Sequence, residues 1–246
     1  MDNLNALETD LRALRMPFIR EQYQDVAKHA VAKSLGHIDY LHMLISGEAQ
    51  QRAQRATQRR IRHAAFPYLR TLDTYEFTHP KKVDRMHIQG LFRLSFMREH
   101  ANVVFIGTTG LGKTHLAIAL AHHACLEGYK VLCTGATAMV NDLLAAQAQH
   151  RLPEAIKRYT KPDLLLVDEL GYLPIDKLGA DLLFQVISGR YERGSMIVTT
   201  NLVFKNWAQI FSGDATLTSA ALDRLLHHHE LIMIDGPSYR MKKPTK

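Results

Sequence analysis

Hydrophobic positions recur at helical spacing through the first part of the chain. Four leucines three or four residues apart share one helical face: Leu4, Leu7, Leu11 and Leu14. Pro17 then opens a second helical run, and a third run extends from about Asp39 to Phe66. The pattern predicts a small all-helical N-terminal domain over residues 1–68. Residues 69–101 are predicted to form a linker and a short lead-in helix.

From Asn102 onward, short apolar strands alternate with amphipathic helices. The strands are expected at residues 103–106, 130–134, 164–167, 195–200 and 231–234. The helices are expected at residues 113–127, 137–149, 153–160, 177–192 and 217–228. This alternation is typical of a parallel sheet covered by helices, so residues 102–246 are predicted to form an α/β domain.

The segment GTTGLGKT at residues 107–114 follows the first of these strands and opens a helix. It matches the phosphate-binding pattern GxxxxGK[ST] in the strand–loop–helix context that the chemistry needs. We expect Gly110 and Gly112 to let the backbone wrap round phosphate oxygens, and Lys113 to reach the β- and γ-phosphates of ATP. The residues expected to bind ATP are Gly107, Thr108, Thr109, Gly110, Leu111, Gly112, Lys113, Thr114 and His115.

Two adjacent acids, Asp168 and Glu169, end a fully apolar strand. Unpaired carboxylates at a sheet edge repel each other, so the pair predicts a nearby cation. We expect Thr114 and Asp168 to hold Mg²⁺, and Glu169 to orient and polarise the attacking water, which favours hydrolysis of ATP. Asn201 ends the next predicted strand and is expected beside Glu169, holding the water or sensing the γ-phosphate; the alternative is that it caps the following turn.

Composition limits the other chemistry. The chain of 246 residues is 46% hydrophobic, has no apolar stretch long enough to cross a bilayer and lacks the apolar core of a secretion signal, so a cytoplasmic location is expected. Cys125 and Cys133 are interpreted as small buried hydrophobic residues. The run of residues 227–229 is all histidine, but neither carboxylates nor cysteines stand near it at ligand spacing, so no zinc site is expected.

Positive charge is concentrated in the helical region. The net charge is +7, and between Ala49 and Leu72 there are six arginines and no acid. Four of them fall within an arc of about 80° on one helix: Arg52, Arg55, Arg59 and Arg62. This stripe, with Lys157 and Arg158 in a second basic cluster, predicts sequence-independent contacts with DNA phosphates. DNA or partner binding is therefore assigned to the helical domain of residues 1–68. The alternative is a solvated face that keeps the chain soluble.

Five segments together resemble the IstB-like family of insertion-sequence transposition ATPases: GTTGLGKT, LLLVDELGYLP, RYERGSMIVTTN, LDRLLHH and SYR. That family belongs to the AAA+ class and is similar to the DnaC helicase loaders. The resemblance implies a P-loop AAA+ three-layer domain and an Mg²⁺-dependent ATPase that forms a homo-oligomer with ATP on DNA and assists a transposase. It further implies that Arg224 is an arginine finger for a neighbouring subunit and that Arg240 is a sensor arginine facing the γ-phosphate.

Several points stay open from the residues alone. Arg190 and Arg193 compete with Arg224 for the role in a neighbouring subunit. The chain ends 12 residues after Ile234, which predicts a reduced C-terminal lid with Arg240 on a short tail. Two other functions remain: a DnaC-like replicative helicase loader, and a non-catalytic DNA-binding protein that uses ATP only as an assembly switch. A transposase gene next to this one would favour the first interpretation over the helicase loader.

Overall fold

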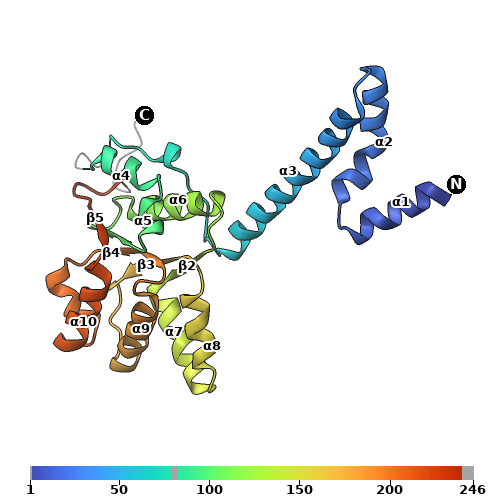
Figure 1. The fold of residues 1–246 in the computed structure, drawn as a ribbon. Helices are drawn as coiled ribbons and strands as arrows, with labels where there is room; N and C mark the ends of the chain where they lie inside the picture. Colours follow the sequence, from blue (N-terminus) through green and yellow to red (C-terminus); the bar gives the residue numbers. More distant parts are fainter. Residues whose placement is uncertain (1, 79–82, 240–246) are drawn as a thin grey trace. The chain divides into compact units, whose positions relative to one another are not determined.

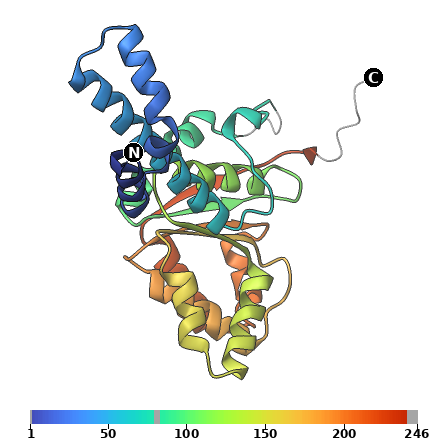
Figure 2. The same cartoon turned by 90° about the vertical axis from the view of Figure 1, so that its right-hand side faces the viewer.

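The computed structural model describes residues 2–78 and 83–239 (Figures 1 and 2). The chain divides into two compact units, Met1–Arg59 and Arg60–Lys246. Helix α3 (His37–His63) contains the point of division. No helix among the described residues is long and apolar enough to cross a membrane.

The first unit is helical, as the leucine spacing predicts. It contains α1 (Asp2–Ala13), α2 (Pro17–Ala32) and most of α3. Its small core is formed by Leu11, Ile19 and Leu44. Of the four leucines that mark the first helix, Leu11 is buried, whereas the others are exposed.

A buried carboxylate joins α3 to the start of α2. Glu48 is only 5% exposed, and its Oε2 accepts hydrogen bonds from the backbone N–H groups of Phe18 (2.9 Å) and Ile19 (3.3 Å). The first N–H groups of a helix have no partner within the helix. Because the N-cap residue Met16 supplies no side-chain bond, Glu48 satisfies these groups from a remote position in the sequence.

The second unit contains a fully parallel five-stranded sheet in the order β2-β3-β4-β1-β5. Its strands are β1 (Asn102–Ile106), β2 (Val131–Gly135), β3 (Leu164–Leu170), β4 (Ser195–Thr200) and β5 (His229–Met233). Strand β4 lies between β3 and β1, and every one of its residues is buried. A parallel strand covered on both faces is expected to be apolar, as β4 is from Met196 to Val198.

Helices cover both faces of this sheet (Figure 1). One face carries α4 (Arg85–Leu91), α5 (Ser95–Arg98) and α6 (Lys113–Leu126). The opposite face carries α7 (Ala136–Ala148), α8 (Leu152–Thr160), α9 (Lys177–Arg190) and α10 (Ala215–Leu226). Two hydrophobic cores result, one on each side of the sheet. The predicted three-layer α/β fold is therefore confirmed, and Cys125 and Cys133 are buried free thiols within it.

Three local features differ from the expectation. Strand β3 extends to Leu170, so Asp168 and Glu169 lie within the strand and not beyond it. The predicted linker contains the 3₁₀ helix η1 (Leu72–Thr74), and Tyr75 after it is buried in the core against α6. A second 3₁₀ helix, η2 (Phe204–Gln209), follows β4. Tertiary packing orders these segments, which have no regular hydrophobic period of their own.

Candidate functional site

A cavity of about 290 Å³ opens beyond the carboxyl ends of the central strands. Ligands of parallel α/β sheets bind at this edge. The lining residues come from the loop before α6, from the ends of β3 and β4, from the segment around η1 and from the C-terminal segment: Tyr68, Arg70, Thr74, Tyr75, Glu76, Thr109–His115, Glu169, Tyr172, Thr199, Thr200, Asn201 and Tyr239.

Residues 109–114 of the predicted phosphate-binding loop form one wall of the cavity, whereas Gly107 and Thr108, also predicted to bind ATP, are not among its lining residues. Gly110 and Gly112 adopt φ values of +83° and +84°, a left-handed conformation that favours glycine. Gly112 is the N-cap of α6 and has no side chain to cap the helix, so the N–H groups at the start of α6 remain available. Lys113 Nζ donates to the carbonyl oxygen of Thr108 at 2.8 Å. The loop is thus preformed to surround an anion.

One carboxylate oxygen connects the loop with the sheet. Asp168 Oδ1 accepts hydrogen bonds from Thr114 Oγ1 (2.9 Å) and from Thr199 Oγ1 (2.5 Å). The predicted metal ligands, Thr114 and Asp168, are therefore adjacent. The hydroxyl and carboxylate oxygens are hard ligands of the kind that Mg²⁺ prefers, so the donor set fits this ion.

Glu169 is displaced from the regular strand. The pairing of β3 with β4 shifts register between Val167 and Leu170, and Glu169 has a φ of +59°. Its backbone N–H donates to Thr199 Oγ1 at 2.9 Å. A bulge of this kind re-aims a side chain, and the exposed residue Glu169 lines the cavity together with Asn201.

Thr199 was not singled out by sequence analysis, although its hydroxyl contacts both acidic positions. The side chain is buried at the end of β4. The pair of threonines that follows the apolar residues Met196 to Val198 at the end of this strand is the signal that points to it. The neighbouring Thr200 hydroxyl donates to the carbonyl oxygen of Leu170 at 2.7 Å, which continues the link between the two strands beyond the bulge.

The segment around η1 forms a second wall. His115 Nε2 lies 3.1 Å from both the carbonyl oxygen of Thr71 and the hydroxyl of Thr74. Burial lowers the pKa of His115, the hydrogen bond to Thr71 raises it, and Arg70 lowers it further. Tyr75 donates to the carbonyl oxygen of Leu111 at 3.3 Å, and burial raises its pKa to about 12. Sequence analysis treated this segment as a linker and missed its place in the site.

The C-terminal segment lies against the phosphate-binding loop. The Tyr239 N–H donates to the carbonyl oxygen of Gly110 at 2.9 Å, and the Tyr239 hydroxyl donates to Glu76 Oε1 at 2.9 Å. A side chain at Gly110 would collide with Ser238. Arg240, the predicted sensor arginine, lies outside the described residues.

The three competing arginines have different environments. Arg190 is 1% exposed, and its guanidinium donates to four backbone carbonyl oxygens, those of Tyr159, Pro162, Asp163 and Ser195. The interpretation of Arg190 as a possible arginine finger for a neighbouring subunit is therefore wrong, because its side chain is buried and hydrogen-bonded inside its own domain. Arg193 is exposed. Arg224 lies on α10, with its guanidinium carbon 4.7 Å from the centre of the Phe184 ring.

Some of the side chains predicted to bind DNA are exposed, whereas others contact groups within the protein. Arg55, Arg59 and Arg62 are exposed along α3. Arg52 donates to the carbonyl oxygen of Arg15 at 3.1 Å and lies 3.6 Å from Glu48. On α8, Lys157 is exposed, whereas Arg158 lies 3.3 Å from Asp142 Oδ2, so part of its charge is neutralised.

Comparison with known proteins gives a consistent result. A family model described as IstB-like ATP binding protein matches residues 9–246. The chain is 37% identical over 230 residues to a protein of Geobacillus stearothermophilus named as a putative ATP-binding protein of insertion sequence IS5376, covering 94% of this chain and 91% of that protein. It is 35% identical to the corresponding IS21 protein of Pseudomonas aeruginosa, covering 99% of this chain and 91% of that protein.

Solved structures share the fold at lower identity. The DnaC helicase loader superposes with a TM-score of 0.55 at 22% identity, covering 67% of this chain and 96% of that one. DnaI superposes with a TM-score of 0.58 at 16% identity, covering 68% of this chain and 91% of that one. The second unit thus has the AAA+ P-loop fold. With the family model matching almost the whole sequence, the chain belongs to the family of IstB-like ATP-binding proteins.

Proposed function

We propose that this protein is an Mg²⁺-dependent ATPase that binds DNA, assembles on it with ATP and assists the transposase of an insertion sequence. The observation that carries the catalytic part is the contact of Asp168 with both Thr114 and Thr199, beside the displaced Glu169. The association with transposition is supported by the relatives, several of which are named for insertion sequences.

The triphosphate of ATP is assigned to residues 107–115. The N–H groups of the loop and of the first turn of α6 would donate to the phosphate oxygens, and the partial positive charge of the helix N-terminus favours the anion. Lys113 donates to the carbonyl oxygen of Thr108, and a γ-phosphate would offer it a charged acceptor instead. The base then lies toward Tyr75 and His115, since these side chains line the same cavity at the start of α6.

The metal position is assigned to Thr114 and Asp168. Mg²⁺ bound there would neutralise charge that develops on the phosphate oxygens. Asp168 is held by Thr199, so its carboxylate does not have to be ordered when the cation binds. The Thr114 hydroxyl is already directed at the same oxygen atom.

Hydrolysis is assigned to Glu169 with Asn201. The left-handed backbone at Glu169 costs free energy for a residue other than glycine, and such strain concentrates at functional positions. The bulge places Glu169 at the cavity, where Asn201 also contributes to the lining. Glu169 would orient and polarise the attacking water, and Asn201 would hold the water or contact the γ-phosphate.

Assembly is assigned to Arg224, acting on the ATP of a neighbouring subunit, with Arg240 as sensor of the γ-phosphate in its own subunit. Burial of Arg190 removes one competitor for the first role. Contact with DNA is assigned to Arg52, Arg55, Arg59 and Arg62 and to Lys157 and Arg158. An ATP-linked oligomer would gather many weak phosphate contacts into one strong interaction.

Phosphate release with and without duplex DNA tests the proposal. Lys113→Ala should abolish ATP binding, because it removes the charge that meets the β- and γ-phosphates. Glu169→Gln should still bind ATP with Mg²⁺ but hydrolyse it at least about 100-fold more slowly, consistent with the weight of a general base. Glu127→Gln, an exposed change just after α6, is the matched control and should retain full turnover.

Two outcomes would contradict this assignment. Equal turnover in the Glu169→Gln and Glu127→Gln variants would remove Glu169 from the reaction. Absence of phosphate release from the unaltered protein with Mg²⁺ and DNA, together with ATP-dependent assembly, would favour a non-catalytic assembly switch.

A further inference from the structure

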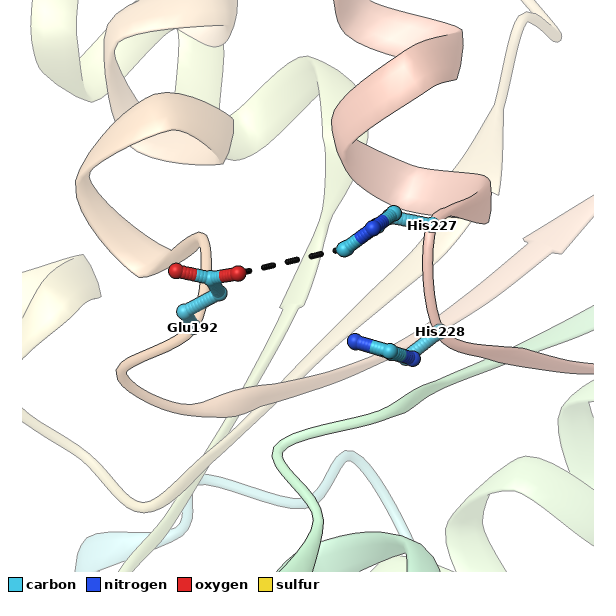
Figure 3. A group of neighbouring side chains, drawn as sticks. All are labelled: Glu192, His227 and His228. Carbon is cyan, nitrogen blue, oxygen red and sulfur yellow. Dashed lines mark ion pairs between the residues drawn. The ribbon is translucent and has the colours of Figure 1, made fainter.

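A second cluster of chemically active side chains lies at the edge of the sheet opposite to the nucleotide cavity. Glu192 precedes the first residue of β4, and His227 and His228 precede the first residue of β5. All three therefore lie at the amino ends of parallel strands, whereas the cavity lies beyond the carboxyl ends. In the sequence no carboxylate stands at ligand spacing around the histidine run, but in the structure the turn after α9 brings Glu192 to it (Figure 3).

The three side chains are close enough to share one cation. Glu192 Oε1 lies 4.0 Å from His227 Nδ1, and the rings of His227 and His228 have centroids 4.2 Å apart. One ligand atom from each residue lies within 4.8 Å of the others. Ligand atoms around a tetrahedral cation with bonds of about 2.0–2.2 Å are roughly 3.3–3.6 Å apart. Closure thus needs a movement of about 1 Å, which rotation of exposed side chains provides.

Hydrogen bonds, several of them to the buried residues Arg190 and Asn102, fix the backbone on both sides of the cluster. Glu192 has a φ of +56°, in a turn closed by hydrogen bonds from the N–H groups of Arg193 (2.9 Å) and Gly194 (3.1 Å) to the carbonyl oxygen of Arg190. The buried Arg190 guanidinium also donates to the carbonyl oxygen of Ser195, the first residue of β4. On the other element, the His228 carbonyl oxygen accepts from the N–H of Asn102 at 2.8 Å. Only side chains have to move when a ligand arrives.

We propose that Glu192, His227 and His228 bind a divalent transition-metal cation of the Zn²⁺ type. Two imidazoles and one carboxylate suit Zn²⁺, Co²⁺ and Ni²⁺, whereas Mg²⁺ prefers a set of oxygen ligands, so the two metal positions are chemically distinct. Three protein ligands leave further coordination positions for water. The Tyr191 hydroxyl lies 3.1 Å from His227 Nδ1, the ring nitrogen that faces Glu192, so this hydrogen bond is exchanged for the bond to the cation when the cation binds.

The cation would join two elements that are otherwise linked by side-chain contacts. Glu192 belongs to the α9–β4 connection, and His227 and His228 belong to the end of α10 and the turn that follows it. A ligand that binds only the folded state raises the midpoint of thermal unfolding as its concentration exceeds its dissociation constant. The proposal does not rest on ATP hydrolysis, and its test needs no nucleotide.

The test is titration of the metal-free full chain with Co²⁺ and then Zn²⁺, in millimolar Mg²⁺, followed by calorimetry and by the visible absorption of Co²⁺. We expect one equivalent to bind, with a rise in the unfolding midpoint. Glu192→Gln and His228→Ala should each weaken binding about tenfold or more. His229→Ala is the matched control, because its Nδ1 contacts the carbonyl oxygen of Leu226 at 2.7 Å and it lies outside the cluster.

The variants distinguish a site that needs Glu192, His227 and His228 from binding by the consecutive histidines of residues 227–229 alone. Equal weakening by His228→Ala and His229→Ala, with no effect of Glu192→Gln, would mean that the run alone holds the ion and would overturn the proposal. Failure of the unaltered chain to bind either cation would overturn it as well. Unfolding midpoints without metal should agree among all four proteins, which shows that the substitutions leave the fold intact.

Discussion

At the scale of the residue, identical side chains acquire different roles from their surroundings. Arg190 and Arg193 flank the same turn, yet the first is 1% exposed and the second is exposed. Burial lowers the pKa of Arg190 to about 10, while the nearby Asp163 raises it. Four carbonyl oxygens replace the water from which burial removes the guanidinium, so the charge is retained inside the domain.

Replacement of Arg190 should therefore act on stability. Arg190→Ala leaves buried carbonyl oxygens without donors, which we expect to cost about 3 kcal/mol or more in the free energy of unfolding. Arg193→Ala, the exposed neighbour, should cost less than about 0.5 kcal/mol. Urea unfolding followed by circular dichroism measures both. A stable Arg190→Ala protein that fails only to activate ATP turnover in a neighbouring subunit would contradict the structural role.

At the scale of the element, the segment around η1 was predicted to be a linker, but in the structure it forms a wall of the candidate nucleotide site. His115 of α6 makes two contacts with this segment. Its Nε2 lies 3.1 Å from the carbonyl oxygen of Thr71, and its ring centroid lies 5.4 Å from that of Tyr75. These contacts place Tyr75 beside Gly112, where a side chain would collide with the tyrosine ring. Gly112 thus allows two things: the left-handed backbone of the phosphate-binding loop and the close packing of Tyr75 against that loop.

The lowered pKa of His115 makes this packing sensitive to pH. Because the folded state favours the neutral imidazole, it binds fewer protons than the unfolded state between the folded and unfolded pKa values. Stability should be complete above about pH 6.5 and should fall as the pH drops below that value. His115→Asn should reduce the decrease in the unfolding midpoint that is measured between pH 8 and pH 5.5.

His122 is the matched comparison for this measurement. Burial lowers its pKa as well, so His122→Asn should remove a separate part of the acid-dependent decrease. If His115→Asn left the difference between the two pH values unchanged, the imidazole of His115 would not be held neutral by the fold.

At the scale of the whole molecule, the exposed arginines of α3 are the strongest candidates for contact with a polyanion. Arg55, Arg59 and Arg62 are exposed, whereas Arg52 contacts Glu48 and the carbonyl oxygen of Arg15. Arg60 donates to the carbonyl oxygen of Cys125 at 2.9 Å. The arginine-rich segment therefore combines structural contacts with solvent-exposed positive charge.

The salt dependence of DNA binding distinguishes these roles. Replacement of Arg55, Arg59 and Arg62 by alanine should reduce the slope of log K against log salt by about 0.9 for each phosphate that is no longer bound. Fluorescence anisotropy with duplex DNA over a range of salt concentrations measures the slope. Lys28→Ala, an exposed change on α2, should leave it unaltered. If the triple variant and the unaltered protein had the same slope, the arginine stripe would be interpreted as a solvated face that keeps the chain soluble.

The sequence by itself determined the features that depend on neighbours along the chain. The strand–loop–helix context of residues 107–114, the alternation of strands and helices and the three N-terminal helices were all predicted, with ends within a few residues of those observed. Helical and strand periodicity, glycine freedom and helix capping are local properties, and a linear pattern records them directly.

Tertiary structure alone decided which remote side chains meet. The hydroxyl of Thr199 reaches Asp168, Tyr75 packs on the phosphate-binding loop, Arg190 is enclosed, and Glu192 comes beside His227. These contacts join segments separated by many residues, and they depend on the order of the strands and on the helices packed against them. Sheet order and close packing arise from burial across the whole domain, so no local pattern encodes these pairings.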